Sequence, residues 1–265
     1  MSFRARSFIF DGTPSEEFGL VISNIGNDRQ NPGAIGSELD ILEDRIPRRY
    51  TAIHYGTTGN EPLSFPIVFS TDKDNGSFDR YDIARISGWL TGHQQYKKLV
   101  LDEADMTGIY YNCIIKELTQ VEVNGKTVGF KAVVICDSPF AYRILPDTVV
   151  TCNNSLNFVY RNMSNVNDYY RPTMTIVTSA ASVTIKNNTD GSTFTLSGMP
   201  KVSKTISIDG ESMVMNSSDG TNLYACWNPG AAKYVFRALR GDNQISVSGA
   251  CTITIKNEFP WSIGY

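Results

Sequence analysis

The chain has 265 residues, of which 41% are hydrophobic and 19% charged, and its formal net charge is −3. This balance excludes an extensively disordered chain and gives no electrostatic attraction to nucleic acid or to an anionic membrane. Arg4 and Arg6 interrupt the apolar N-terminus, and no later run is long enough to span a bilayer. Since domains usually contain about 50 to 200 residues, we expect two globular β-rich domains in a soluble protein.

The N-terminal segment predicts a hairpin followed by an irregular arm. Residues 6–10 and 18–25 read as strands that pair across the turn-forming cluster at residues 11–15. Residues 26–61 then alternate glycines with charged residues, and only a short strand around residues 39–42 is expected there. A long irregular segment in a compact domain is usually functional, so we expect this arm to reach an adjacent subunit.

Residues 78–90 predict an amphipathic helix, the only helix expected in the chain. Ser77 is the expected N-cap, and Gly92 is well placed to end the helix. Apolar side chains recur at helical spacing and should place Trp89 against the N-terminal sheet. The predicted apolar face consists of Phe78, Tyr81, Ile86, Trp89 and Leu90.

A long β-hairpin and a domain boundary are predicted next. Strands starting near Ile109 and Val128 flank Asn124-Gly125, a pair that favours a two-residue type I′ turn. Two prolines then interrupt the strand pattern within residues 138–146. We therefore place the domains at residues 1–140 and 145–265.

The second half predicts an all-β domain. Short alternating runs such as TMTIVT, SVTIKN, TFTLSG and TITIKN are separated by Asp-Gly turn signals at Asp190, Asp209 and Asp219. This roughly ten-residue spacing is typical of a β-sandwich, and no further helix is evident. The predicted fold class is mainly β, with two β-sandwich-like domains and one packed helix in the first.

Five cysteines form an odd set without a Cys-x-x-Cys motif: Cys113, Cys136, Cys152, Cys226 and Cys251. Several lie in apolar strand patterns, which favours buried free thiols in a reducing cytosol. The alternative is a disulfide pair such as Cys226 with Cys251.

No catalytic, cofactor-binding or metal-binding residues are predicted, and we expect neither a cofactor nor enzyme activity. His54 and His93 are the only histidines, too few for a histidine metal cluster or a Ser-His-Asp triad. Asp102, Glu103 and Asp105 could be imagined as hydrolase carboxylates, but their place between two strands favours a solvated turn. Nucleotide-binding and nucleophile-elbow motifs are absent from the sequence.

Two basic spots are too short for a nucleic-acid site. They are Arg48-Arg49-Tyr50 and Lys97-Lys98, and each has acidic residues nearby. We interpret them as solvated faces or intersubunit ion pairs.

In the order and length of its elements, the chain resembles the distal tail proteins of long-tailed phages. The likeness rests on the strand-helix-strand order of residues 64–137, on FIFDGTPSEEFGLVIS at residues 8–23 and on RALRGDNQISV at residues 237–247. The resemblance implies a structural hub in which six copies form a ring around a DNA channel, with a galectin-like C-terminal sandwich.

The resemblance also implies where the chain is found and what it contacts. It implies assembly in the bacterial cytoplasm and a final place at the tail tip of the virion. The implied partners are further copies of the chain, the tail tube protein and the tail hub or tail-associated lysin protein. The tape measure and receptor-binding proteins are further candidates.

An alternative is a carbohydrate-binding module at the tail tip that contributes directly to host adsorption. Trp227 and Trp261 could stack on a sugar ring, but residues 141–265 contain no histidine, which a galectin-type site uses. A shared fold does not transfer a binding site. We therefore expect both tryptophans in the core or at an interface, and a cell-wall hydrolase is the third candidate.

Overall fold

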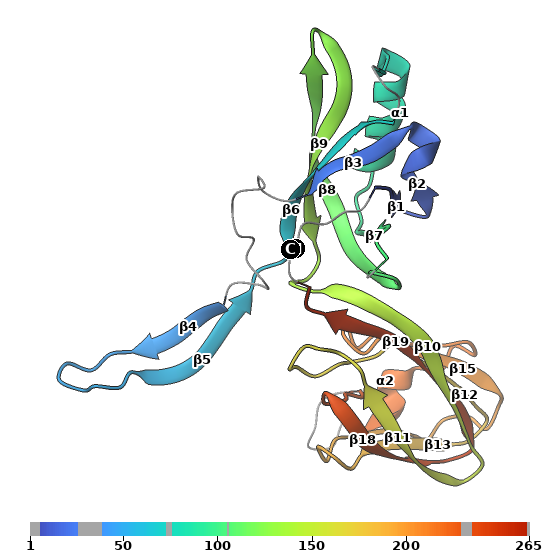
Figure 1. Cartoon of the computed structure of the whole chain (residues 1–265). Helices are drawn as coiled ribbons and strands as arrows, with labels where there is room; N and C mark the ends of the chain where they lie inside the picture. Colours follow the sequence, from blue (N-terminus) through green and yellow to red (C-terminus); the bar gives the residue numbers. More distant parts are fainter. Residues whose placement is uncertain (1–5, 26–38, 73–75, 105, 229–234, 264–265) are drawn as a thin grey trace. The chain divides into compact units, whose positions relative to one another are not determined.

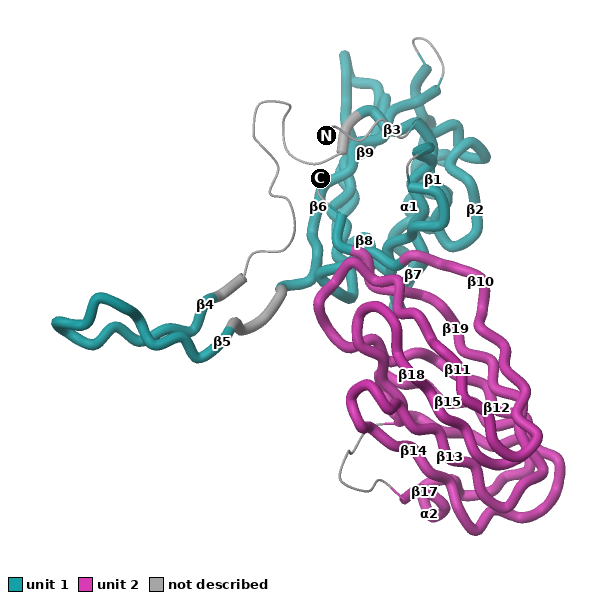
Figure 2. The backbone as a smooth tube through the Cα atoms, turned by 60° about the horizontal axis from the view of Figure 1, so that its bottom comes forward, with its two compact units in different colours: residues 1–142, 262–265 teal, residues 143–261 magenta. Residues whose placement is uncertain are grey.

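The computed structural model of the chain is mainly β (Figure 1). It describes residues 6–25, 39–72, 76–104, 106–228 and 235–263. Two compact units are present, residues 1–142 with 262–265 and residues 143–261 (Figure 2). The predicted fold class, mainly β with two domains, is thereby confirmed. None of the helices in the described ranges has the length and apolar character needed to cross a bilayer.

The first unit is built on an antiparallel sheet with the order β3-β6-β9-β8-β7-β1-β2. Alternation of buried and outward side chains along β6 supplies Phe65, Ile67 and Phe69 to its core. A separate two-stranded sheet contains β4 and β5. The strands are β1 Phe8–Phe10, β2 Thr13–Pro14, β3 Leu20–Ile25, β4 Leu39–Asp44, β5 Ile53–Asn60, β6 Ser64–Thr71, β7 Lys97–Leu101, β8 Ile109–Val123 and β9 Lys126–Cys136.

The β8–β9 hairpin has the predicted turn. Asn124 and Gly125 have φ values of 52° and 73°, and two consecutive positive φ values are what a type I′ turn requires. On the inward face of β9, Phe130, Ala132 and Val134 are buried. The prediction of this hairpin is confirmed.

The predicted hairpin of residues 6–10 with residues 18–25 is wrong as a strand ladder, although the N–H of Ile22 donates to the carbonyl of Arg6 at 2.9 Å. β1 pairs with β2 and β7, whereas β3 pairs with β6. The 3-10 turn η1, Ser15–Phe18, separates β2 from β3 and ends at Gly19. Gly19 has a φ of 62°, a left-handed conformation that glycine adopts readily and that turns the chain towards β6.

The helix α1, Arg80–Thr91, starts later than predicted. Its N-cap is Asp79 rather than Ser77, because the Asp79 carboxylate accepts hydrogen bonds from the backbone N–H groups of Tyr81 and Asp82, both at 2.8 Å. Tyr81 belongs to this first turn and is 86% exposed, so its prediction as part of the apolar face is wrong. Ile86 and Leu90 are buried, and the helix ends at Gly92 as predicted.

Trp89 packs within a column of aromatic rings. Its ring lies 4.2 Å from that of Phe18 at an interplanar angle of 3°, and 5.7 Å from that of Phe8. Phe8 in turn stacks on Phe69 of β6 at 4.6 Å. The indole N–H donates to the carbonyl oxygen of Phe10 at 3.3 Å. The predicted packing of Trp89 against the sheet is confirmed.

The second unit contains two antiparallel sheets, with orders β16-β15-β12-β19-β10 and β11-β18-β13-β14-β17. Their inward side chains form one core, which includes Ile176, Phe194, Val247 and Ile253. The strands are β10 Ala141–Cys152, β11 Ser155–Asn162, β12 Met174–Thr178, β13 Ser182–Asn187, β14 Thr193–Ser197, β15 Lys204–Ile208, β16 Met215–Ser217, β17 Trp227–Asn228, β18 Gly241–Ser248 and β19 Cys251–Trp261.

Two features of this unit differ from the sequence prediction. The strands β10 and β11 were not expected, because Pro146 and several polar residues obscure their alternation. A short helix, α2 Leu223–Cys226, contradicts the expectation of no helix after Leu90. It is a single turn capped by Asn222, too short to give a detectable helical period.

Candidate assembly surfaces

The β4–β5 hairpin exposes apolar side chains. Among the described residues, its two strands pair only with each other. Its exposed large side chains are Ile41, Leu42, Ile46, Tyr50 and Tyr55. A lone two-stranded hairpin is at best marginally stable in water, and contiguous exposed apolar surface marks interaction sites. The hairpin is therefore a candidate contact site for another protein surface.

The connection between β4 and β5 is basic. Arg48 and Arg49 are exposed there, and Arg48 has a φ of 71°. The nearby ion pair between Arg45 and Glu43, at 3.1 Å, is also exposed. Such a pair contributes little to stability. The first predicted basic spot thus lies in the hairpin turn, where its charge is available to a partner.

Of the predictions for residues 26–61, the structure bears only on the strands, and the contact with an adjacent subunit stays a prediction. The prediction included a strand around residues 39–42 but missed β5, and residues 26–38 lie outside the described ranges. Residues Ile53–Asn60 contain β-branched and aromatic residues that favour a strand, but Gly56 and Gly59 interrupt this pattern. Glycine inside a strand weakens the pattern that identifies it.

A second candidate surface is one edge of β8. β7 pairs with β8 only at Tyr111, Asn112 and Cys113, whereas β9 pairs with β8 up to Val123. Beyond Cys113, β7 no longer pairs with β8. Unpaired strand edges present N–H and C=O groups that can pair with another chain.

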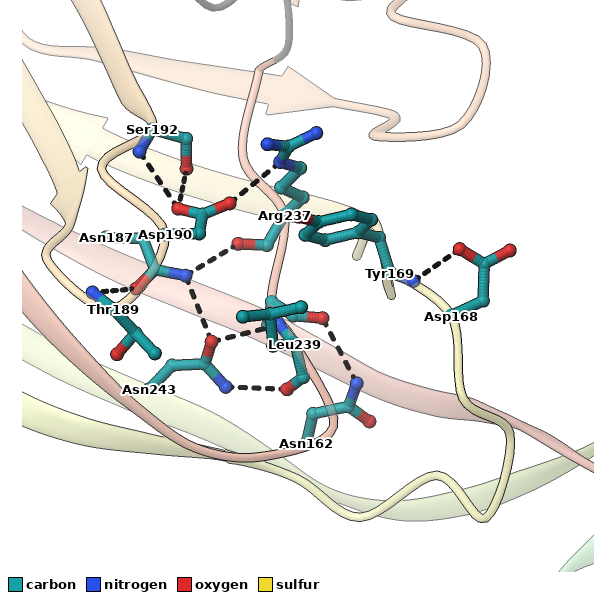
Figure 3. Close-up of polar contacts among 11 residues, drawn as sticks. Asn162, Asp168, Tyr169, Asn187, Thr189, Asp190, Ser192, Arg237, Leu239 and Asn243 are labelled. Atoms are coloured by element: carbon teal, nitrogen blue, oxygen red, sulfur yellow. Dashed lines mark hydrogen bonds and ion pairs between the residues drawn. The ribbon is translucent and has the colours of Figure 1, made fainter.

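Buried amides hold the RALRGDNQISV segment of the second unit in place (Figure 3). Asn187 and Asn243 are both 0% exposed. Asn187 Nδ2 donates to the carbonyl of Arg237 and to Asn243 Oδ1, both at 3.0 Å. The amide of Asn243 then accepts from the N–H of Leu239 at 2.9 Å and donates to its carbonyl at 2.7 Å. These bonds satisfy buried backbone groups, so this stretch stabilises the unit.

An ion pair extends the same cluster. Arg237 Nε donates to Asp190 Oδ2 at 2.8 Å, and its guanidinium lies 4.0 Å from the ring centre of Tyr169. Burial acts to raise the pKa of Asp190, but hydrogen bonds from Ser192 and Arg237 hold it below the ordinary value. The carboxylate is thus kept ionised by groups that position it, an arrangement typical of a structural ion pair.

The two tryptophans considered for sugar stacking are not brought together. Trp227 lies in β17 and packs against the hydrophobic core of the second unit. Trp261 ends β19, in the other sheet, and carries the Arg143 guanidinium 4.8 Å from its ring centre. For Trp227, the prediction of a core position is confirmed.

The two histidines lie in different segments of the chain, and Asp102 and Glu103 directly follow β7, in the predicted connection between two strands. His54 is exposed on β5, whereas His93 Nε2 is 2.8 Å from the carbonyl oxygen of Trp89. Asp102 accepts a hydrogen bond from Ser7 Oγ at 2.9 Å. Asp105 lies outside the described residues. Among those that are described, no group of three histidine, cysteine or acidic residues could hold a metal ion.

The remaining basic spot lies at the surface of the first unit, where both lysines have partners within that unit. Lys97 Nζ pairs with Asp11 at 2.8 Å, and Lys98 Nζ lies 4.1 Å from the ring centre of Tyr110. All five cysteines are free thiols; Cys226 is partly buried and the other four are buried. The prediction of buried free thiols is confirmed, and Cys226 and Cys251 form no disulfide.

Comparisons with known proteins point to phage tails. Residues 3–138 match the family described as phage tail protein N-terminal domain, and residues 140–257 match the phage tail C-terminal domain. The crystal structure of SPP1 Dit, described as a paradigm of the hub adsorption apparatus in phages that infect Gram-positive bacteria, has a similar fold. The match has a TM-score of 0.69 and 11% identity, and it covers 96% of this chain and 98% of that one.

A second solved structure also shares the fold. A chain of the phage p2 baseplate in its activated conformation matches with a TM-score of 0.54 and 11% identity, covering 94% of this chain and 97% of that one. No curated protein sequence matches the chain.

Proposed function

Because the chain belongs to the family of phage tail proteins, whose two domains it matches in succession, we propose that it is the structural hub of a phage tail tip. Copies of the chain form a ring that joins the tail tube to the baseplate and receptor-binding apparatus and leaves a channel for DNA. The fold shared with SPP1 Dit over nearly the full length of both chains supports this role.

The observation that carries the proposal is the β4–β5 hairpin. Its apolar side chains are exposed, and no further strand in the described part of the chain pairs with β4 or β5. A hairpin of one copy that packs on a different surface of the next copy gives a heterologous contact, and such contacts close into rings when the rotation allows. The part of β8 beyond its pairing with β7 is proposed as a second place for intersubunit contact. The six-fold number of copies rests on the likeness to distal tail proteins.

The proposed role is structural rather than enzymatic, and its place is the tail of the virion. Assembly takes place in the host cytoplasm. The partners proposed are other copies of the chain, the tail tube protein and the tail hub or tail-associated lysin. The tape measure and receptor-binding proteins are further proposed contacts.

Light scattering coupled to gel filtration tests the ring. For the unaltered chain, we expect about six times the subunit mass of 29.4 kDa. The double variant Ile41→Ser/Tyr50→Ser should elute as a folded monomer, because both side chains lie on the exposed hairpin. The matched control Tyr81→Ser/Val159→Ser removes two exposed side chains from other elements and should retain the ring. A ring that survives in the hairpin variant would refute the arm contact.

For the second unit, we propose a scaffold that holds receptor-binding or baseplate components through protein contacts. A stable attachment needs about 1,200 Å² of interface or more. The rival carbohydrate function gains little support from the tryptophans, because Trp227 is partly buried against the core and the Arg143 guanidinium lies over the Trp261 ring at 4.8 Å. Micromolar binding of host polysaccharide by the full chain, lost in Trp261→Ala, would favour the rival function.

A further inference from the structure

Two cysteines face each other across the β8–β9 hairpin. Cys113 and Cys136 are directly opposite in the antiparallel register, and both are 0% exposed. In the neighbouring pair, the N–H of Asp137 donates to the carbonyl of Asn112 at 2.9 Å. Hydrogen-bonded and non-hydrogen-bonded pairs alternate along an antiparallel ladder, so the cysteines form a non-hydrogen-bonded pair.

The backbone of Cys136 supports this assignment. Its N–H points away from β8 and donates to the carbonyl of Leu63 at 2.8 Å. In a non-hydrogen-bonded pair the Cα atoms lie about 4.5 Å apart, and the side chains are on the same face. A disulfide needs a Cα separation of about 4.4 to 6.8 Å. The two thiols can therefore be joined without separating the strands.

The surroundings of the pair slow its oxidation. Burial raises the pKa of both thiols, and that of Cys136 reaches about 12. The Asp137 carboxylate raises both pKa values further, and Cys136 adds to the rise at Cys113. Since the thiolate is the attacking species, the pair stays reduced under reducing conditions and reacts slowly while the strands are closed.

We propose that Cys113 and Cys136 form a reversible cross-strand disulfide when the chain meets a small-molecule disulfide such as oxidised glutathione. The Sγ–Sγ bond of the protein forms as the S–S bond of the oxidant breaks. Two electrons pass to the oxidant, and both thiol protons end on the two glutathione molecules released. The typical Cα separation of about 4.5 Å for such a pair lies within the disulfide range, so the bond can form in the folded chain and can be reduced again by a small thiol.

The other cysteines provide internal controls. Cys251 lies near Cys152, which adds to the rise in its pKa caused mainly by burial. However, the Cys152 thiol donates to the carbonyl of Val247 at 3.7 Å. Cys226 is partly buried and far from the hairpin in sequence. Because its register is directly established, the pair in the first unit is expected to give the dominant cross-link.

The test uses the full chain in excess oxidised glutathione, both in the folded state and refolded from urea in the same buffer. After alkylation of free thiols, peptide mass spectrometry should find a bond between residues 113 and 136 in both samples, formed more slowly in the folded one. The cross-link should raise Tm, because it restricts the unfolded chain, and dithiothreitol should abolish both effects. Cys136→Ala should lose the bond, and Cys226→Ala should retain it.

Two outcomes would overturn the proposal. One is that the thiols at 113 and 136 remain fully alkylated after refolding; the other is a dominant bond that involves Cys152, Cys226 or Cys251. Neither outcome depends on the proposed hub function, because ring formation is measured separately on the reduced chain.

Discussion

Two antiparallel hairpins of the first unit, β4–β5 and β8–β9, have opposite surroundings. In β8–β9, one face is buried through Phe130 and Val134, and β6 pairs along β9. In β4–β5, Ile41 and Tyr55 are exposed, and no further strand of the described chain pairs with either edge. Strand pairing alone does not stabilise a hairpin. We infer that β8–β9 is stabilised within the chain, whereas β4–β5 depends on contact with another chain.

The largest expected loss of stability comes from removing a large buried side chain from β8–β9. Phe130 is 1% exposed and packs against Phe78 at 5.4 Å. Phe130→Ala should lower the free energy of unfolding by about 3 to 5 kcal/mol, through lost burial and the cavity left behind. In urea denaturation, the matched change Tyr55→Ala in β4–β5 should stay within about 0.5 kcal/mol. Equal losses of unfolding free energy in the two variants would contradict the inference that only β8–β9 is stabilised within the chain.

Helix α1 packs against β8, so Trp89→Ala probes the same buried region. We expect a loss of about 3 kcal/mol, at the lower end for an aromatic side chain because Trp89 is only partly buried. The stacking with Phe18 and Phe8 is lost with it. Thermal stability close to the unaltered chain, combined with failed ring assembly, would instead place Trp89 at a docking surface.

The base of β8–β9 should give a pH-dependent effect. Burial raises the pKa of Asp137, despite hydrogen bonds from Asn112 and Tyr142. A raised folded pKa means that the folded state binds the proton more tightly, so its contribution to stability is present at low pH and is lost as pH rises through the folded pKa. One group changes stability by at most about 1.4 kcal/mol per pH unit. The difference between the unaltered chain and Asp137→Asn should follow this slope, and a flat difference would contradict it.

The turn of β8–β9 gives the smallest effect. Gly125 has a φ of 73°, so Gly125→Ala should cost about 1 kcal/mol through backbone strain alone. Gly88→Ala is the control, because a Cβ there meets no atom within 4 Å inside α1. That change should stabilise the helix by about 0.5 to 1 kcal/mol. Calorimetry that gave the same sign for both variants would argue against the type I′ turn.

Local signals predicted the elements whose formation depends on neighbours in sequence. The Asn124-Gly125 turn, the end of α1 at Gly92 and most strands of the second unit follow from such signals. The partner of β1 did not, because β7 is about ninety residues away and its pairing depends on the packed sheet. Ser77 and Asp79 are both good N-cap residues, and the sequence does not show at which of them the helix begins.

The candidate surfaces were predictable to different extents. The arm could be located from its irregular composition, but its hairpin was hidden by glycines at positions 56 and 59. The segment RALRGDNQISV was identified from the sequence, whereas its anchoring was not. Asn187 is 56 residues from Asn243 in sequence. An asparagine amide can donate to and accept from many groups, so the sequence does not identify its hydrogen-bond partner.

The aromatic column around Trp89 also gives the molecule a selective optical reporter. The chain has three tryptophans; Trp227 and Trp261 belong to the second unit, and Trp89 belongs to the first. In a Trp227→Phe/Trp261→Phe background, all indole fluorescence comes from a ring stacked on Phe18 and Phe8. Its emission then records the melting of one unit, while circular dichroism records both. Whether the two units unfold as one cooperative system is therefore measurable in a single sample.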